Sequence, residues 1–406
     1  MKDKKGIWML VSLLVIISLL IGSFSCAPAA PKEETIKIGG LFELTGLIST
    51  CGVQESQAVI VALEQVGYEV AGKKIEYFEE DTGTDVAMTM DKVRKLVERD
   101  KVGITIGPTW GPSGQAMAPY LQRMQVPALA ISAYQDELAP FRSFWLTTGL
   151  LRGQTYSMGV YAYEELGYRT ASVMSQDWSA MFQYADGFVM GFEESGGEVI
   201  QHQFPPIGTF DYTPYIVKLE DADVLAVEII GAEEIAVVQQ LKEQGVWGKM
   251  PVVLPTEVGL LDPPMLEAVG EAAVGLVCEA HYRWGAPTTG NEEFVAAYKE
   301  RWGYYPGGYA GMAYAATQVA LNAIERTGGD MSYDALSKAL DETDLDTVRG
   351  HVSFTEQRVG ITEARIVRIV NMISPQEFVI DTIARYKVTP ELVGGEKWEF
   401  HVERVE

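Results

Sequence analysis

Residues 104–134 constrain the fold more than any other part of the chain. A short β-branched run, Ile104–Ile106, stops at a Gly-Pro pair, and a second apolar run, Ala128–Ile131, follows another proline. Between these runs apolar side chains recur every three or four residues, which predicts a helix with Ser113 available to cap its start. Pro119 inside this pattern predicts a kink, or a start nearer Met117. The stretch therefore predicts one complete βαβ step of a parallel sheet.

The connection in that step, Gly107–Gly114, has the sequence GPTWGPSG. In an open parallel sheet such loops line the ligand crevice, and backbone N–H groups at a helix start favour a carboxylate or another anion. A tight turn without any ligand is the alternative. The loop lacks the Lys-Ser/Thr pair of a nucleotide-binding P-loop, so we do not expect a nucleotide there.

The same alternation of strand and helix patterns continues along most of the chain. We expect strands at 36–41, 74–78, 104–106, 128–131, 170–174, 199–204, 224–230, 252–254 and 274–279. We expect helices at 152–166, 212–219, 232–244, 292–301 and 309–326. We also expect one helix that ends at 67, one that starts after 85 and one that ends near 195–197. Since 406 residues exceed what one core usually holds, these elements predict two doubly wound α/β domains.

The first residues predict export. Three lysines precede an uncharged apolar run, Ile7–Ile21, which ends in a short small-residue segment before Cys26. Ser25 before Cys26 resembles a bacterial lipoprotein cleavage site, which implies lipid attachment at Cys26 and a signal peptide at 1–26. Ser23 and Phe24 depart from that pattern, so an ordinary secreted protein or an uncleaved anchor stays open. Residues 27–34 would form a tether.

The charge and the cysteines narrow the partners. A formal net charge of -24 argues against nucleic acid and against binding to an anionic lipid surface, because both need a basic patch. Export leaves Cys51 and Cys278 in an oxidising compartment. A disulfide between them is open, because the sequence does not fix their distance.

A catalytic interpretation depends on one acidic cluster, which comprises Glu79, Glu80, Asp81 and Asp85. Clustered carboxylates serve acid/base chemistry or hold a metal, but a strand end and a helix cap at Asp85 explain them as well. The histidines are widely spaced, and no HExxH or GxSxG motif is present. We therefore expect no enzyme, no metal and no cofactor.

Several motifs, in a shared order, resemble the type I periplasmic binding proteins, specifically the branched-chain amino-acid-binding subfamily of ABC importers. They are IKIGGLFELTG at 36–46, EEDTGTD at 79–85, IGPTWGPSGQAMAP at 106–119, LTTGLLRGQ at 146–154, FEESGGEVI at 192–200, FDYTPYIVKL at 210–219 and AYKERWGYYPGGYAGMAYAAT at 297–317. The resemblance implies two Rossmann-like doubly wound lobes joined by a three-segment hinge. Lobe one would take 35–146 and 282–350, lobe two 147–281 and 351–390, and 391–406 would be a C-terminal tail.

The resemblance also implies ligand-binding positions, several of which differ here from the family pattern. An aromatic after the first strand is replaced by Cys51, and the carboxylate-holding Ser falls near Gly111. The full set of expected binding residues is Cys51, Trp110, Gly111, Ser113, Ser132, Tyr134, Trp178, Ile230 and Glu257. Glu257 would meet an α-ammonium group. This set implies that the backbone N–H groups still hold an anion, while added apolar surface suits a ligand larger or less polar than leucine.

The resemblance implies an extracytoplasmic solute-binding protein, lipid-anchored or periplasmic, that delivers a branched-chain amino acid or a related small carboxylate or amide to an importer. Its partners would be the ligand, the ABC permease and ATPase subunits and, through the lipid, the membrane. A receptor lipoprotein of the same fold that senses a ligand without transport is the alternative.

Overall fold

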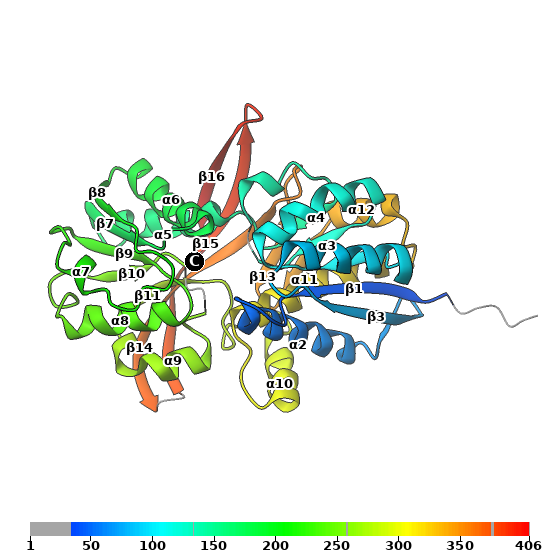
Figure 1. The fold of residues 1–406 in the computed structure, drawn as a ribbon, viewed down its shortest axis with the longest axis horizontal. Helices are drawn as coiled ribbons and strands as arrows, with labels where there is room; N and C mark the ends of the chain where they lie inside the picture. The colour runs from blue at the N-terminus through cyan, green and yellow to red at the C-terminus, as the bar shows by residue number, and fades with distance from the viewer. Residues whose placement is uncertain (1–33, 133, 257–258, 375–376, 406) are drawn as a thin grey trace, which may run out of the picture. The chain divides into compact units, whose positions relative to one another are not determined.

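Two sheets with parallel central strands organise the chain, as the alternating sequence pattern predicts (Figure 1). The computed structural model describes residues 34–132, 134–256, 259–374 and 377–405, and residues 36–406 form one compact unit. The strands are β1 (Ile36–Phe42), β2 (Glu69–Val70), β3 (Lys73–Asp81), β4 (Ile104–Ile106), β5 (Ala128–Ala130), β6 (Phe144–Leu146), β7 (Thr170–Ser175), β8 (Glu198–Gln203), β9 (Val224–Glu228), β10 (Val252–Leu254), β11 (Val277–Ala280), β12 (Asp344–Thr347), β13 (Gly350–Phe354), β14 (Gly360–Ser374), β15 (Glu377–Val393) and β16 (Lys397–Arg404).

The α-helices flank these sheets. They are α2 (Ser49–Gln65), α3 (Val86–Arg94), α4 (Gly111–Met124), α5 (Leu151–Glu164), α6 (Ser179–Glu194), α7 (Thr213–Ile216), α8 (Ala232–Glu243), α9 (Pro263–Val269), α10 (Asn291–Trp302), α11 (Gly308–Arg326) and α12 (Tyr333–Asp341). Shorter turns are η1 (Lys95–Asp100), η2 (Asp136–Leu138) and η3 (Gly270–Ala273). Asp85 caps α3 as expected, because its side chain accepts a hydrogen bond from the Met88 N–H group (2.7 Å).

The first sheet has the strand order β2-β3-β1-β4-β5-β6 and is the centre of lobe one. Its strands β1, β4 and β5 are buried on both faces: α2 and α11 cover one face and α3 and α4 the other. The parallel registers place Ile38 of β1 opposite Ile104 of β4, and Thr105 opposite Ala128 of β5. Burial on both faces explains why these strands read as continuous apolar runs.

The second sheet is the centre of lobe two, and β7, β9 and β10 run parallel within it. The helices α5 and α6 pack on one face, and α8 and α9 on the other (Figure 1). Beyond β11 the sheet becomes antiparallel through β14, β15 and β16. The two lobes of the expected fold are therefore confirmed.

Two local expectations can be compared with the structure. Ser113 does not cap α4, because the helix already begins at Gly111 and Trp110 precedes it. Pro119 lies within α4, which begins at Gly111, so a start near Met117 is wrong, and the alternative of a kink at Pro119 stays a prediction. The residues expected as a tail, 391–406, contribute the end of β15 and all of β16.

Candidate functional site

Each sheet has a topological switch point, where successive connections leave in opposite directions and a crevice forms at the strand ends. In lobe one it lies between β1 and β4, because the chain goes from β1 outward to β3 and then returns to β4. In lobe two it lies between β7 and β9 for the same reason. The segments that follow these four strands are therefore the first place to look for a ligand site.

Glu43 is the first polar side chain after β1, and it is completely buried. Its carboxylate accepts hydrogen bonds from the backbone N–H groups of Thr109 (3.3 Å) and Trp110 (3.2 Å), directly before α4. Two N–H groups of the loop that was expected to hold a ligand carboxylate therefore bind a carboxyl group of the chain itself. The expected ligand contacts at Gly111 and Ser113 stay predictions.

A second carboxyl group lies beside the first. Glu55 projects from α2, is completely buried, and accepts a hydrogen bond from the hydroxyl of Thr109 through Oε1. Burial raises the pKa of Glu55 well above its usual value, and the charge of Glu43 raises it further. Burial also raises the pKa of Glu43, against the two N–H groups that lower it. We call Glu43 and Glu55 the lobe-one acidic pair.

Cys51 lies one helical turn before Glu55 on α2. Burial raises the pKa of its thiol, and the charge of Glu55 raises it further. The hydroxyl of Tyr309, at the start of α11, hydrogen-bonds with this thiol. Burial likewise raises the pKa of Tyr309, with further contributions from Cys51 and from Tyr184 of lobe two. Tyr309 thus stands between the acidic pair and the other lobe.

The remaining expected residues of lobe one surround the start of α4. Trp110 is partly exposed there. Gly111 leaves room for Gln135, whose amide would lie 2.4 to 2.8 Å from a Cβ at that position. Ser113 is buried, and its hydroxyl shares a hydrogen bond with Thr89 of α3 (2.7 Å).

Ser132 and Tyr134 follow β5. Ser132 is buried. Tyr134 is completely buried in the lobe-one core, where its hydroxyl donates to the carbonyl oxygen of Pro108 and its ring packs on Gly114. Burial raises the pKa of Tyr134, and the charges of Glu43 and then Glu55 raise it further. Tyr134 therefore supports the loop before α4 from behind.

Trp178 and Ile230 meet at the switch point of lobe two. Trp178 directly precedes α6 and Ile230 follows β9, and both pack on Leu151, Met181 and Tyr184. The Ile230 N–H group donates to the side chain of Gln176 (3.3 Å), which fixes the β9 end against the β7 end. The indole Nε1 of Trp178 is buried and has no hydrogen-bond partner within the described ranges. This cluster is an apolar surface with one unused donor.

Contacts between the lobes come from Asp262, at the start of α9. Its carboxylate accepts hydrogen bonds from the Gln54 side chain of α2 (2.7 Å) and from the Gly308 N–H group of α11 (2.9 Å). On α6, also in lobe two, the side chain of Gln183 accepts a hydrogen bond from the backbone N–H group of Asp136 in lobe one (3.4 Å). Asp262 and Gln183, which the sequence did not single out, thus connect the two lobes.

The hinge is crossed by a buried arginine. Arg349 precedes β13, and it donates to the carbonyl oxygen of His281 (2.8 Å) and to the hydroxyl of Thr148 (2.9 Å). These partners belong to the two other segments that pass between the sheets. Burial lowers the pKa of Arg349 to about 10, against the opposing charge of Glu279.

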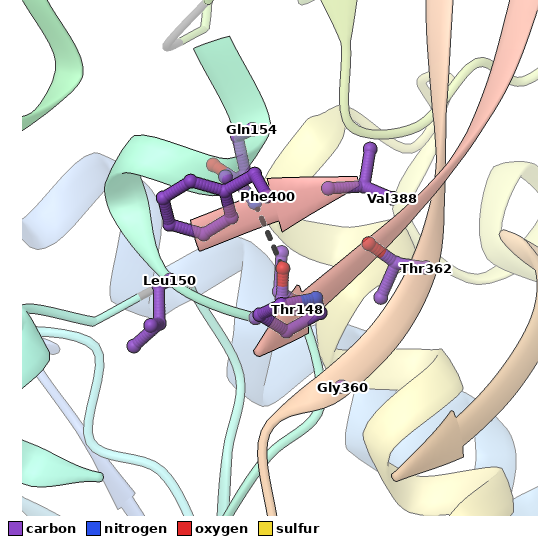
Figure 2. Close-up of a pocket in the computed structure, with 10 residues that line it drawn as sticks. Thr148, Leu150, Gln154, Gly360, Thr362, Val388 and Phe400 are labelled. Atoms are coloured by element: carbon purple, nitrogen blue, oxygen red, sulfur yellow. Dashed lines mark hydrogen bonds between the residues drawn. The ribbon is translucent and has the colours of Figure 1, made fainter. Parts of the chain in front are cut away.

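A small recess beside the hinge is visible in Figure 2. Gln154 donates to the Thr148 carbonyl oxygen (3.1 Å) at its base, and Thr362, Val388 and Phe400 close it from the strand side (Figure 2). The cavity measures about 10 Å³. That is room for about one water molecule, so the recess is too small for a solute.

Three further expectations concern the acidic cluster, the two cysteines, and the residues Glu257 and Cys26. Glu80 pairs with Lys92 (2.8 Å) and Lys95, so this part of the acidic cluster serves structure. Cys51 and Cys278 are not joined in a disulfide. Two expected residues, Glu257 and Cys26, lie outside the described residues.

The described part of the chain offers neither a metal cluster nor a membrane span. No group of three or more His, Cys, Asp or Glu side chains is arranged to hold a metal ion among residues 34–405, with 133, 257–258 and 375–376 left aside. Within the same ranges, no helix has both the length and the apolar character needed to cross a bilayer.

Comparisons with known proteins agree with this architecture. A sequence profile described as Periplasmic binding protein matches residues 35–372. The Leu/Ile/Val-binding protein homolog 6 of Brucella suis is 23% identical over 363 residues, covering 86% of this chain and 90% of its own.

Two solved structures share the fold over most of their length. An ABC transporter substrate-binding protein from Sphaerobacter thermophilus superposes with a TM-score of 0.81 at 26% identity, over 87% of this chain and 98% of its own. A solute-binding protein of an ABC transporter from Rhodopseudomonas palustris, in complex with 3,4-dihydroxybenzoic acid, superposes with a TM-score of 0.77 at 25% identity. The match covers 87% of this chain and 97% of that protein. The names of these similar proteins thus include both an amino-acid binder and a binder of an aromatic acid.

Proposed function

Because the chain belongs to the periplasmic binding protein family, we propose that it is the extracytoplasmic solute-binding protein of an ABC importer. It captures a small solute between the switch points of its two lobes and delivers that solute to the permease. The observation that carries this proposal is the contact of Asp262 with Gln54 and Gly308, because it links the candidate sites of both lobes. A ligand held by both lobes stabilises the conformation in which they meet.

The proposed ligand class is a branched-chain amino acid or a related small carboxylate or amide. Its apolar part would lie against Trp178, Ile230 and Tyr184, where each Å² of apolar surface removed from water contributes roughly 25 cal/mol. Cys51, Trp110, Gly111 and Ser132 are the proposed contacts on the lobe-one side. Ser113 and Tyr134 support this side indirectly, because their hydroxyl groups are engaged within lobe one. Glu257 stays a proposed ligand contact.

The division of the chain is part of this proposal. Lobe one would take 35–146 and 282–350, and lobe two 147–281 and 351–390. The signal peptide at 1–26, lipid attachment at Cys26 and the tether at 27–34 are proposed from the sequence pattern alone. The permease and ATPase subunits are the proposed partners, and the chain acts as a binding protein without catalysis.

Uptake measurements test the proposal. Deletion of the chromosomal gene should abolish high-affinity uptake of the solute that the purified protein binds, and a plasmid copy should restore it. The matched control is uptake of an unrelated sugar, which should not change. Unchanged uptake of every solute that the protein binds would favour the alternative, a receptor lipoprotein that senses its ligand without transport.

A further inference from the structure

Among the described residues, the lobe-one acidic pair has no cationic partner. The groups that act on Glu43 and Glu55 are backbone N–H groups, the hydroxyls of Thr82 and Thr109, and the two carboxyls themselves. Removing a carboxylate from water is costly, so burial raises both pKa values and favours the protonated carboxyl groups. A ligand that brings a positive charge would stabilise the ionised pair, because the described residues supply no opposite charge there.

Two buried atoms next to this pair, Glu55 Oε2 and Gln135 Oε1, have no hydrogen-bond partner among the described residues, and both can accept a hydrogen bond. Gln135 lies against Gly111, so its amide oxygen is placed at the start of α4 beside Trp110. Buried acceptors are normally satisfied, so this part of the site requires a donor from outside the chain.

The N–H groups that would attract a ligand carboxylate are already used. Thr109 and Trp110 donate theirs to Glu43. A ligand carboxylate placed here would find no open donor on these two groups and would meet two carboxyl groups at short range. The aromatic side chains of Tyr134 and Tyr309 lie within electrostatic range of Glu55, since burial raises the pKa of both and the charge of Glu55 raises it further. Aromatic faces attract cations, which adds to the same preference.

We propose that the solute presents a protonated nitrogen, such as a primary ammonium or an amidinium group, to Glu43 and Glu55. This inference rests on the proposed function and specifies the ligand class of that same site. The N–H groups of the ligand bind Glu55 Oε2 and the amide oxygen of Gln135. The apolar body of the ligand extends toward Trp178 and Ile230. A carboxyl group on the ligand is not required at the start of α4.

The test uses the full chain and pairs of probes that differ only in their charged group. Isoamylamine is compared with 4-methylpentanoate, benzylamine with benzoate, and leucine carries both groups. Calorimetric titration at neutral pH should show each amine binding roughly ten to a hundred times more tightly than its carboxylate counterpart, because an ammonium group donates to the buried carboxyl oxygens and a carboxylate is repelled by them. Equal binding of both, or tighter binding of the carboxylates, overturns the inference.

A matched pair of variants locates the effect. Glu55→Gln should weaken amine binding by roughly tenfold or more and leave carboxylate binding equal or stronger. Glu79→Gln is the control. Glu79 lies outside the pair, and its carboxylate accepts a hydrogen bond from the hydroxyl of Ser56 (2.6 Å), the residue that follows Glu55 on α2. Near-ultraviolet circular dichroism confirms folding of both variants. An unchanged amine affinity in Glu55→Gln overturns the inference.

A pH profile provides the last readout. Since burial raises the pKa of Glu55, amine affinity should fall as the pH is lowered into the range where Glu55 takes up a proton, and Glu55→Gln should flatten the profile. Binding of carboxylates without amines overturns this inference and leaves the proposed function intact. No binding in either series overturns the inference, and unchanged uptake after gene deletion overturns the proposed function separately.

Discussion

At the scale of single residues, buried carboxyl groups outside the lobe-one acidic pair also lack partners. Glu234, in the first turn of α8, is 1% exposed, and both of its oxygens are without a hydrogen-bond partner in the part of the chain that the structure describes. Burial raises the pKa of Glu234 well above the usual value, and the charge of Asp262 raises it further. Glu234 therefore reduces stability wherever it is ionised.

We predict that Glu234→Gln stabilises the protein at pH 8 and has little effect near pH 4. A carboxyl group whose pKa is raised on folding contributes stability that is present below its unfolded pKa and is lost as the pH rises through its folded pKa. A tenfold difference in proton affinity between the folded and unfolded states corresponds to about 1.4 kcal/mol, so a gain of roughly 1–3 kcal/mol at pH 8 is expected. Thermal unfolding at both pH values measures it.

The control for this prediction is Glu243→Gln, an exposed position on the same helix. Its melting temperature should follow that of the unmodified protein at both pH values. A Glu234→Gln variant that is no more stable than the parent at pH 8 would show that the Glu234 carboxylate has a stabilising partner.

At the scale of elements, α5 and α6 pack with their backbones in contact. A Cβ at Gly191 would lie 2.2 Å from the carbonyl oxygen of Tyr156, and a Cβ at Gly159 would lie 2.3 Å from that of Phe188. Gly187 meets the carbonyl oxygen of Arg152 in the same way, at 2.2 Å. These helices lie on the face of the second sheet next to Trp178, so their spacing positions the lobe-two side of the site.

We predict that Gly191→Ala destabilises the protein by about 1–3 kcal/mol, because the added methyl group forces the two helices apart in a close-packed interior. Urea unfolding monitored by circular dichroism measures the loss. Gly248→Ala is the matched control, since a Cβ there has no neighbour nearer than 3.8 Å and the residue has no positive φ. Equal stability of both variants would contradict the close packing of α5 on α6.

The hairpin of β15 and β16 differs from the expected C-terminal tail. Trp398 and Phe400 alternate with exposed or half-exposed residues on β16 and are buried in a core cluster that also contains Tyr156 of α5. Phe400 and Tyr156 lie 5.8 Å apart between ring centroids. This alternation is a strand signal with period two, and it could have been recognised in the residues that we expected to form a tail.

At the scale of the whole molecule, Asp262 and Gln183 both join the lobes directly, and Arg349 joins the hinge segments. We predict that Asp262→Ala weakens isoamylamine binding about fivefold, because losing roughly 1 kcal/mol of contact lowers the population of the conformation that binds. Calorimetry measures the affinity, and small-angle scattering should show a larger radius of gyration without ligand.

Asp330→Ala is the control for this prediction, because Asp330 is an exposed residue whose side chain accepts a hydrogen bond from the Ser332 N–H group within lobe one (2.9 Å). This variant should change neither the affinity for isoamylamine nor the radius of gyration without ligand. If Asp262→Ala binds the amine with parental affinity, the Asp262 contact has no part in ligand capture.

The hinge prediction concerns Arg349→Met, which removes the hydrogen bonds to His281 and Thr148 and leaves the charge of Glu279 less compensated. A loss of about 3–5 kcal/mol is expected, because breaking a buried ionic network on one side is strongly destabilising. Thermal unfolding measures it, and adding Glu279→Gln should recover part of the loss.

Arg326→Met is the matched control for the hinge, since Arg326 pairs with Glu342 at the surface (3.2 Å). Exposed pairs contribute about 0–1 kcal/mol, so this variant should remain close to the parent. Similar losses in both variants would assign no special role to Arg349.

The sequence by itself determined the two parallel sheets, the order of most of their strands and helices, and the Asp85 cap. These features follow from local periodicity and from capping chemistry, which are visible in neighbouring residues. It also indicated where an anion meets the start of α4. Only the tertiary structure decided which group lies there: Glu43, after β1, accepts hydrogen bonds from Thr109 and Trp110 after the neighbouring strand β4, and Glu55 joins it from α2. Contacts between distant segments have no local period, so the polarity of the site became visible only in the folded chain.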